Sequence, residues 1–149
     1  MNRTRPTKHE WVGPFEVQKL LDHSIDGAIP LPPESGSAYV VTQRSWNTEP
    51  SADCGVLYVG GNTGRSARFR TRLGDLLADS FGFFGGGTGH SSGGQSLHRW
   101  CRENHINPLR LHLAWVKRCK CHRCLEIELF RDLSPLLNKV VPSRCSVHG

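Results

Sequence analysis

Apolar and polar residues along the chain follow patterns that predict short strands. Residues 37–43 and 55–61 are rich in β-branched and aromatic side chains, a composition typical of strands. The polar insert between them indicates a pair of antiparallel neighbours. Residues 109–116 alternate leucine or tryptophan with polar or small residues, and this period of two predicts a third strand that is buried on one face.

Helical spacing of apolar residues marks the segments around these strands. Between residues 65 and 78, Phe69, Leu73 and Leu76 recur at i, i+4 and i+7, which predicts an amphipathic helix. Shorter patterns predict three further helices, over residues 14–23, 95–104 and 123–133.

Together these elements predict an α/β protein of the α+β type, with a small, mostly antiparallel three-stranded sheet flanked by helices. Its 149 residues suit one domain. Polar residues 1–13 are expected to be loose, and the glycine-rich stretch 81–94 to be a loop. We expect three regions, an N-terminal extension with a short helix (1–36), a core (37–140) and a metal-binding element (119–149).

Charge points to a polyanionic partner. The chain has 19 Lys and Arg against 13 Asp and Glu, a net charge of +6 and a pI near 9.3. The excess is clustered, because residues 64–73 and 110–123 carry basic side chains and no acidic ones. Clustering favours nucleic acid over a generic basic surface. No stretch has the length and hydropathy of a membrane span or of a signal peptide, so we expect a cytosolic protein without a membrane partner.

The six cysteines are concentrated towards the C-terminus in a pattern typical of zinc sites. Cys121 and Cys124 form one two-residue spacing, and Cys145 and His148 form another, separated by twenty residues. Cys119, His112 and His122 are close enough along the chain to act as substitute ligands. A site closed by four protein ligands is expected to be structural, and it would pin the tail against the last predicted helix. The two remaining cysteines, Cys54 and Cys101, are predicted to be buried as small apolar residues.

Candidate residues for chemistry lie on the predicted strands and on the last helix. Tyr39 and Tyr58 are the only tyrosines, one on each of the first two strands. Glu126 begins an E-x8-P-x2-N segment that ends at Asn138. Glu128 is two residues further on, about 200° around a helix, so the two glutamates cannot face one site.

With these residues the chain resembles the GIY-YIG nucleases over about residues 37–140. The resemblance implies that the two tyrosines, a helical arginine and one glutamate surround a scissile phosphate. Glu126 would then bind a catalytic Mg²⁺ or Mn²⁺ ion. One tyrosine would activate or position the attacking water and the other would contact the phosphate, and the sequence leaves open which tyrosine has which role.

The family pattern of an apolar residue followed three positions later by arginine is matched by Phe69 and Arg72, with Arg68 as the substitute. The expected nucleic-acid contacts are Arg65, Arg68, Arg70 and Asn138. The chain departs from the family at two positions. Gly61 replaces a lysine found in several members, and Leu76 replaces a histidine found in many. His90, in the glycine-rich stretch, is the candidate replacement for that histidine.

The sequence therefore predicts a metal-dependent endonuclease that acts on DNA, with RNA as an open alternative. A second hypothesis is a non-catalytic, zinc-containing nucleic-acid-binding module in which the tyrosines only pack. A third is a zinc-stabilised interaction protein, which would show no salt-sensitive binding of nucleic acid.

Overall fold

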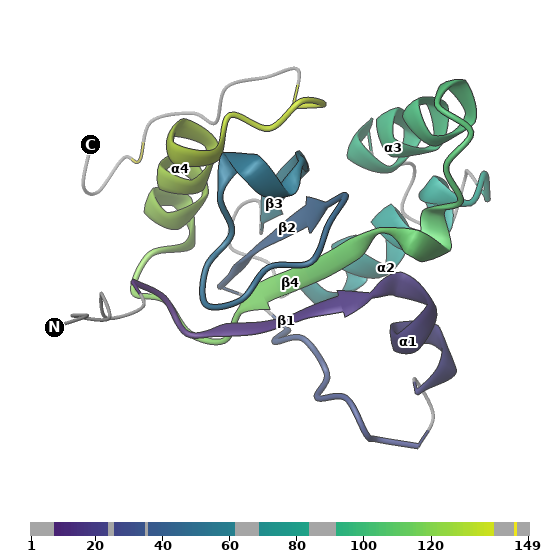
Figure 1. The fold of residues 1–149 in the computed structure, drawn as a ribbon. Coiled ribbons are helices and arrows are strands. Elements are labelled where there is room, and N and C mark those ends of the chain that lie inside the picture. The colour runs from purple at the N-terminus through teal and green to yellow at the C-terminus, as the bar shows by residue number, and fades with distance from the viewer. Residues whose placement is uncertain are drawn as a thin grey trace, which may run out of the picture.

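The computed structural model describes residues 8–23, 26–34, 36–61, 69–83, 92–138 and 145, and it shows an α+β fold (Figure 1). The described residues form a four-stranded antiparallel sheet and four α-helices. In chain order the elements are β1 (Trp11–Glu16), α1 (Val17–Asp22), β2 (Ala38–Thr42), β3 (Val56–Gly61), α2 (Phe69–Ser80), α3 (Ser92–Glu103), β4 (His112–Val116) and α4 (His122–Leu133). Short 3-10 turns precede β3 and β4, at Ala52–Cys54 and Pro108–Arg110.

The sheet has one strand more than the sequence predicts. Its order is β1-β4-β2-β3, and every neighbouring pair is antiparallel. The extra strand β1 comes from residues that were expected to be loose or helical, and the first helix begins only at Val17. Pro14 is tolerated in β1 because an edge strand can spare a backbone N–H. Trp11 pairs with Val116 and Phe15 pairs with Leu113. Pairing with a strand distant in sequence therefore determines the secondary structure of this segment.

Strand β4 is buried on both faces, whereas its alternating pattern predicted burial on one. Leu113 and Trp115 belong to the apolar cluster that includes α2 and α3, and Ala114 and Val116 belong to the cluster that includes α4. Both faces of β4 are buried because the strand lies inside the sheet between β1 and β2, and helices cover both sides of it.

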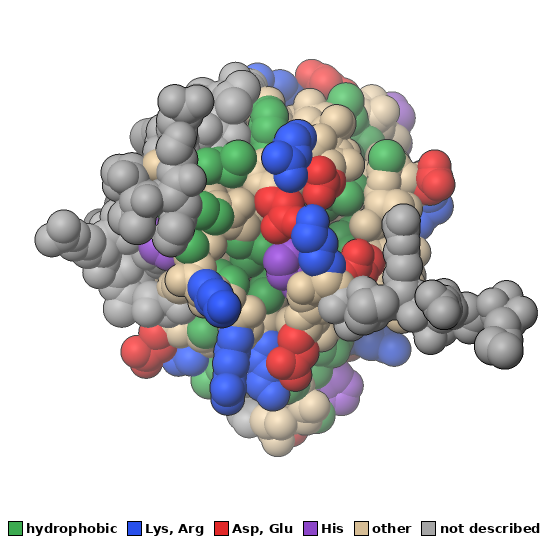
Figure 2. Space-filling view, turned by 90° about the vertical axis from the view of Figure 1, so that its left-hand side faces the viewer, with side chains coloured by type: hydrophobic (Ala, Val, Ile, Leu, Met, Phe, Trp, Pro, Cys, Tyr) green, Lys and Arg blue, Asp and Glu red, His purple; other side chains and the backbone are tan. Residues whose placement is uncertain are grey.

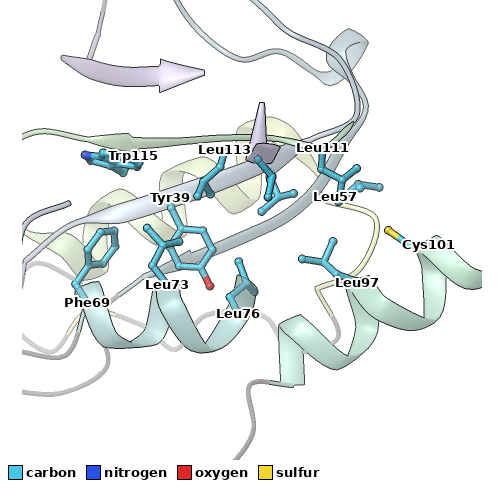
Figure 3. Packing of buried hydrophobic residues seen from close by; sticks show 12 residues of the cluster. Tyr39, Leu57, Phe69, Leu73, Leu76, Leu97, Cys101, Leu111, Leu113 and Trp115 are labelled. Atoms are coloured by element: carbon cyan, nitrogen blue, oxygen red, sulfur yellow. The ribbon is translucent and has the colours of Figure 1, made fainter. Parts of the chain in front are cut away.

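Helices cover the sheet on two sides. Apolar residues of α1, α2 and α3 pack on one face with the Tyr39 ring among them, and Figure 3 shows that ring beside Leu73 and Leu76 of α2. On the other face, α4 packs its buried residues Leu125, Leu129 and Leu133. The spacing of these three leucines confirms the inner side predicted for the last helix.

Helix α3 begins at Ser92, inside the stretch predicted to be a loop. Its second and third residues are glycines, and the third, Gly94, lets it approach α2 closely. A Cβ atom at Gly94 would lie 2.5 Å from the Asp79 Cβ and 2.9 Å from the Leu76 carbonyl oxygen. The glycine composition therefore serves close helix packing here, a use that local propensity does not reveal.

The longest described helices have 12 residues, so none of them could span a bilayer. On the side of the molecule that Figure 2 shows, acidic and basic side chains lie beside one another among smaller apolar areas.

Candidate functional site

The two tyrosines lie on adjacent strands and on the same side of the sheet. Strand pairing places Tyr39 opposite Gly60 and Tyr58 opposite Val41. The two ring centroids are 6.2 Å apart with an interplanar angle of 31°. Tyr39 is 4% exposed, whereas Tyr58 is half-buried. The hairpin therefore presents one shielded and one accessible phenol side by side.

Glycines without side chains make room for both phenol groups. A Cβ atom at Gly60 would lie 2.3 Å from the Tyr39 hydroxyl oxygen, and one at Gly93 would lie 2.4 Å from Tyr58 Cζ. Real Cβ atoms do not approach other atoms so closely, so any other residue at these positions would displace a tyrosine. The analysis of the sequence missed both glycines, although a glycine at the end of a strand is itself a signal of close approach.

Glu126 reaches the same place from α4. Its side chain is 14% exposed, and its Oε2 atom is buried without a hydrogen-bond partner among the described residues. A Cβ atom at Gly61 would lie 3.2 Å from Oε2, so the absence of a side chain at the end of β3 opens this position. Burial raises the pKa of the Glu126 carboxyl, and the positive charges of Arg123 and Arg72 lower it.

Arg72 contributes a positive charge on the α2 side. It lies on α2 with an exposed side chain, and its charge lowers the pKa values of both tyrosines and of Glu126. Burial is the larger effect on the phenols and raises the pKa of each, and the Glu126 charge raises them further. Four residues predicted from the sequence, on four different elements, are thus close enough to influence one another electrostatically.

Glu128 points away from this group. Lys8 forms an ion pair with Glu128 Oε1, and the His9 Nε2 atom lies 3.2 Å from Oε2. The structure therefore agrees with the helical argument that the two glutamates face different surroundings.

Asn138 has a role in the fold. Its amide accepts a hydrogen bond from the Val59 N–H at 2.9 Å and donates one to the Val59 carbonyl at 2.7 Å. The N–H groups of Leu136 and Leu137 bond to the carbonyls of Val56 and Leu57. The segment after Pro135 therefore runs along the outer edge of β3 and covers it. These bonds fix α4 relative to β3, and the nucleic-acid contact expected for Asn138 stays a prediction.

The other predicted nucleic-acid contacts are either engaged within the fold or outside the described residues. Arg70 donates to the Pro32 carbonyl at 2.8 Å and lies 3.8 Å from Glu34, so it holds the connector between α1 and β2. The residues that lie outside the described part of the chain are Arg65, Arg68 and His90.

Three of the four predicted zinc ligands come together. The Sγ atoms of Cys121, Cys124 and Cys145 all lie within 4.8 Å of one another, and those of Cys121 and Cys145 are 3.7 Å apart. Cys121 is also the N-cap of α4, because its sulfur accepts from the Cys124 N–H at 3.5 Å. The three thiols therefore form a group that could bind a metal ion. The fourth predicted ligand, His148, lies outside the described residues.

The substitute ligands do not join this group. Among the described residues the metal-ligand atoms gather only at the three cysteines, so Cys119, His112 and His122 are not part of it. Cys119 instead donates to the Gly36 carbonyl at 3.0 Å. Cys54 and Cys101 are buried at 6% and 2% exposure, which confirms the prediction for both.

Comparisons with protein-family models, with curated proteins and with solved structures found no match.

Proposed function

We propose that this protein is a metal-dependent endonuclease of the GIY-YIG type that hydrolyses phosphodiester bonds in DNA. The observation that supports it most is the state of Glu126. One of its carboxylate oxygens is buried without a hydrogen bond, close to two tyrosines and an arginine from three other elements. Leaving a carboxylate buried without donors costs free energy, so a site for a ligand is the better explanation.

Glu126 fits the role of protein ligand for Mg²⁺ or Mn²⁺. Its unpaired Oε2 is a hard oxygen donor, and it lies close to the Gly61 backbone, where the lack of a side chain makes room for the carboxylate. Such ions take one carboxylate and complete their shell with water and substrate phosphate. When bound, the ion would supply Lewis-acid stabilisation of the negative charge on the phosphate.

The remaining residues of the site have roles that follow from their protonation and exposure. Arg72 is always charged and would bind the non-bridging oxygens, stabilising charge that develops in the transition state. A phenol is protonated at neutral pH at its ordinary pKa of 10.0, and burial raises the pKa of both tyrosines further, so each could donate a hydrogen bond to a ligand. Tyr58 is the more accessible phenol and would contact a bound water or phosphate directly. The buried Tyr39 would help to orient Tyr58.

The cysteine group has a separate structural role in this proposal. Three thiolates with this spacing suit Zn²⁺, and His148, three residues after Cys145, would close a tetrahedral site. A closed site has no open position for water and therefore contributes to folding and not to hydrolysis.

The second candidate is a non-catalytic, zinc-containing nucleic-acid-binding module. It is favoured by the packing of Tyr39, whose ring lies 5.9 Å from that of Phe69 inside the apolar cluster (Figure 3). That packing is ordinary for a core tyrosine. However, a binding module has no need of an unpaired carboxylate oxygen beside the phenols.

Cleavage assays decide between the two candidates. Purified protein is incubated with supercoiled plasmid, single-stranded DNA and RNA, with and without Mg²⁺ or Mn²⁺. The nuclease proposal expects metal-dependent nicking or linearisation of DNA by the wild type. Salt-sensitive binding without cleavage of any substrate, in either metal, would support the binding module instead. Elemental analysis of the same preparation should give one zinc per chain.

A further inference from the structure

Arg123, in the first turn of α4, lies next to both the cysteine group and the proposed phosphate site. Arg123 lies between Cys121 and Cys124 and one helical turn before Glu126. Its Nη1 atom is 4.0 Å from the unpaired Oε2 of Glu126, and its side chain is 26% exposed. This distance is too long for a hydrogen bond, so Glu126 does not occupy the donors of the guanidinium.

An arginine in this position does not serve the stability of the helix. The N-terminal end of a helix carries partial positive charge, so a cation in the first turn is unfavourable there. The first turn of α4 contains no acidic residue that would offset it. Its nearest carboxylate, Glu126, makes no hydrogen bond with it. Because the guanidinium is partly exposed and is not hydrogen-bonded to Glu126, it can bind a ligand with negative charge.

The cysteine group holds the backbone on both sides of Arg123. Cys121 precedes it by two residues and Cys124 follows it directly, and both sulfurs lie within 4.8 Å of Cys145 Sγ. A metal ion bound by these three residues would tie this turn to a part of the chain more than twenty residues away. The direction in which Arg123 leaves the helix is then set by the metal site.

We propose that Arg123 is a second phosphate-binding residue of the nuclease site and that the metal-bound cysteine group positions it. This inference rests on the proposed function, because it places the phosphate beside Glu126. If Glu126 held a divalent cation, the like charges would favour contact of the Arg123 guanidinium with a non-bridging oxygen of the same phosphodiester. Arg72 would hold the phosphate from the α2 side and Arg123 from the α4 side.

The test measures binding separately from cleavage. Fluorescence anisotropy with a labelled duplex oligonucleotide, in Ca²⁺ and at several salt concentrations, gives the affinity and its salt dependence. Arg123→Ala should weaken binding about tenfold and lower the slope of log K against log salt by about one. Arg123→Lys keeps the charge and should keep the slope, while losing bidentate geometry and part of the affinity. Zinc content and melting temperature should match those of the wild type.

Arg131→Ala is the matched control. Arg131 lies on the same helix, is exposed, and pairs with the neighbouring Asp132. Its loss should change affinity by less than about twofold, as expected for an exposed pair. If Arg123→Ala and Arg131→Ala bind alike, or if Arg123→Ala lowers only the melting temperature, Arg123 is a structural residue and the inference is wrong.

The role of the cysteine group is tested by removing the metal. A zinc chelator that leaves Ca²⁺ in place should weaken DNA binding of the wild type more than that of Arg123→Ala, because the variant has already lost the positioned residue. Equal losses in both proteins would separate the metal from Arg123 and overturn the positioning role.

The outcomes also separate this inference from the proposed function. DNA binding that depends on Arg123 in a protein without cleavage would refute the nuclease and keep the phosphate contact. Cleavage at the wild-type rate by Arg123→Ala, with unchanged affinity, would keep the nuclease and refute the contact. A wild type that does not bind DNA at all would refute both.

Discussion

Two glutamates on different faces of α4 differ in their hydrogen-bond and ion-pair partners. Glu126, towards Gly61, is 14% exposed and has an oxygen without a hydrogen bond. Glu128, towards the N-terminal residues, is 19% exposed and is bound by Lys8 and His9. Because the two side chains are buried to a similar degree, burial does not explain why one is paired and the other is not.

The difference lies in how far the partners of each carboxylate offset the loss of its hydration. Contacts with two partners offset the hydration free energy that a half-buried carboxylate loses, and Glu128 has two such partners. For Glu126 less of this hydration free energy is offset, since the Arg123 guanidinium is 4.0 Å away and burial raises the pKa of the carboxyl. Under the proposed function, this carboxylate would bind a cation. The predictions below test whether this contrast is functional.

The largest effect is expected for Glu126→Gln, which removes the charge and keeps the shape. Cleavage should fall by more than about 1,000-fold, because the ligand of the catalytic ion is lost. The fold should become more stable, since a buried, unpaired charge is removed. Mg²⁺ should raise the melting temperature of the wild type and not that of the variant. A variant that still cleaves at an appreciable rate would remove Glu126 from the chemistry.

The same variant has a pH signature with a fixed sign. Burial raises the pKa of folded Glu126 above its ordinary value of 4.5, so the folded state holds its proton more tightly than the unfolded state. The wild type therefore loses stability as pH rises through the window between 4.5 and the folded pKa. Glu126→Gln has no such proton. Its melting temperature should exceed that of the wild type at about pH 8 and approach it at about pH 4.

Arg72→Ala should have the next largest effect. Loss of a group that stabilises transition-state charge should lower kcat by roughly 100- to 1,000-fold. The expected loss of affinity for DNA is much smaller, about tenfold or less. Single-turnover cleavage together with anisotropy measures both quantities. Equal losses of rate and affinity would make Arg72 an ordinary phosphate contact.

Gly93→Ala should disturb the site without removing any of its functional groups. The new Cβ atom would lie 2.4 Å from Tyr58 Cζ, so the phenol must move. A displacement of about 1 Å can lower the rate by roughly 100-fold. Gly74→Ala is the matched control, because Gly74 is also helical and nothing lies within 4 Å of its Cβ position. The control should keep its activity and gain about 0.5–1 kcal/mol of stability.

Asn138→Ala should loosen the placement of α4. It removes two hydrogen bonds to Val59 and should cost about 1–3 kcal/mol, measured by urea denaturation. The rate of cleavage should fall with it, because Glu126 is held by the same connection between α4 and β3. Asn104→Ala, which removes an exposed bond to the Trp100 carbonyl, is the control and should cost less. Full stability in Asn138→Ala would show that the edge contacts of Leu136 and Leu137 suffice.

The smallest effect is expected for Glu128→Gln. Its partner Lys8 is largely exposed, so water and salt screen the ion pair and its loss should change the melting temperature only slightly. Cleavage should stay within about twofold of the wild type, because the other face of α4 is unchanged. A severe loss of activity in Glu128→Gln, with Glu126→Gln active, would reverse the assignment of the two faces.

Local patterns predicted much of the site. The spacing of leucines predicted the inner side of α4, and the angle between positions 126 and 128 predicted that these glutamates face different surroundings. Residue spacing also placed Cys121 and Cys124 in one ligand group. Local patterns did not predict secondary structure where contact with a segment distant in sequence determines it. Residues 11–16 form a strand because they pair with β4. The start of α3 packs against distant segments, since Gly94 lies close to α2 and Gly93 lies close to Tyr58.

The amino-acid sequence by itself determined the elements and the residue types of the site, since periodicity and spacing act over a few neighbouring positions. Only the tertiary structure decided the state of these residues. The Asn138 amide meets the Val59 backbone across 79 positions, and Arg123 lies near an oxygen that burial leaves unpaired. Burial, unpaired atoms and close approach depend on which distant segments meet, and no local pattern encodes that.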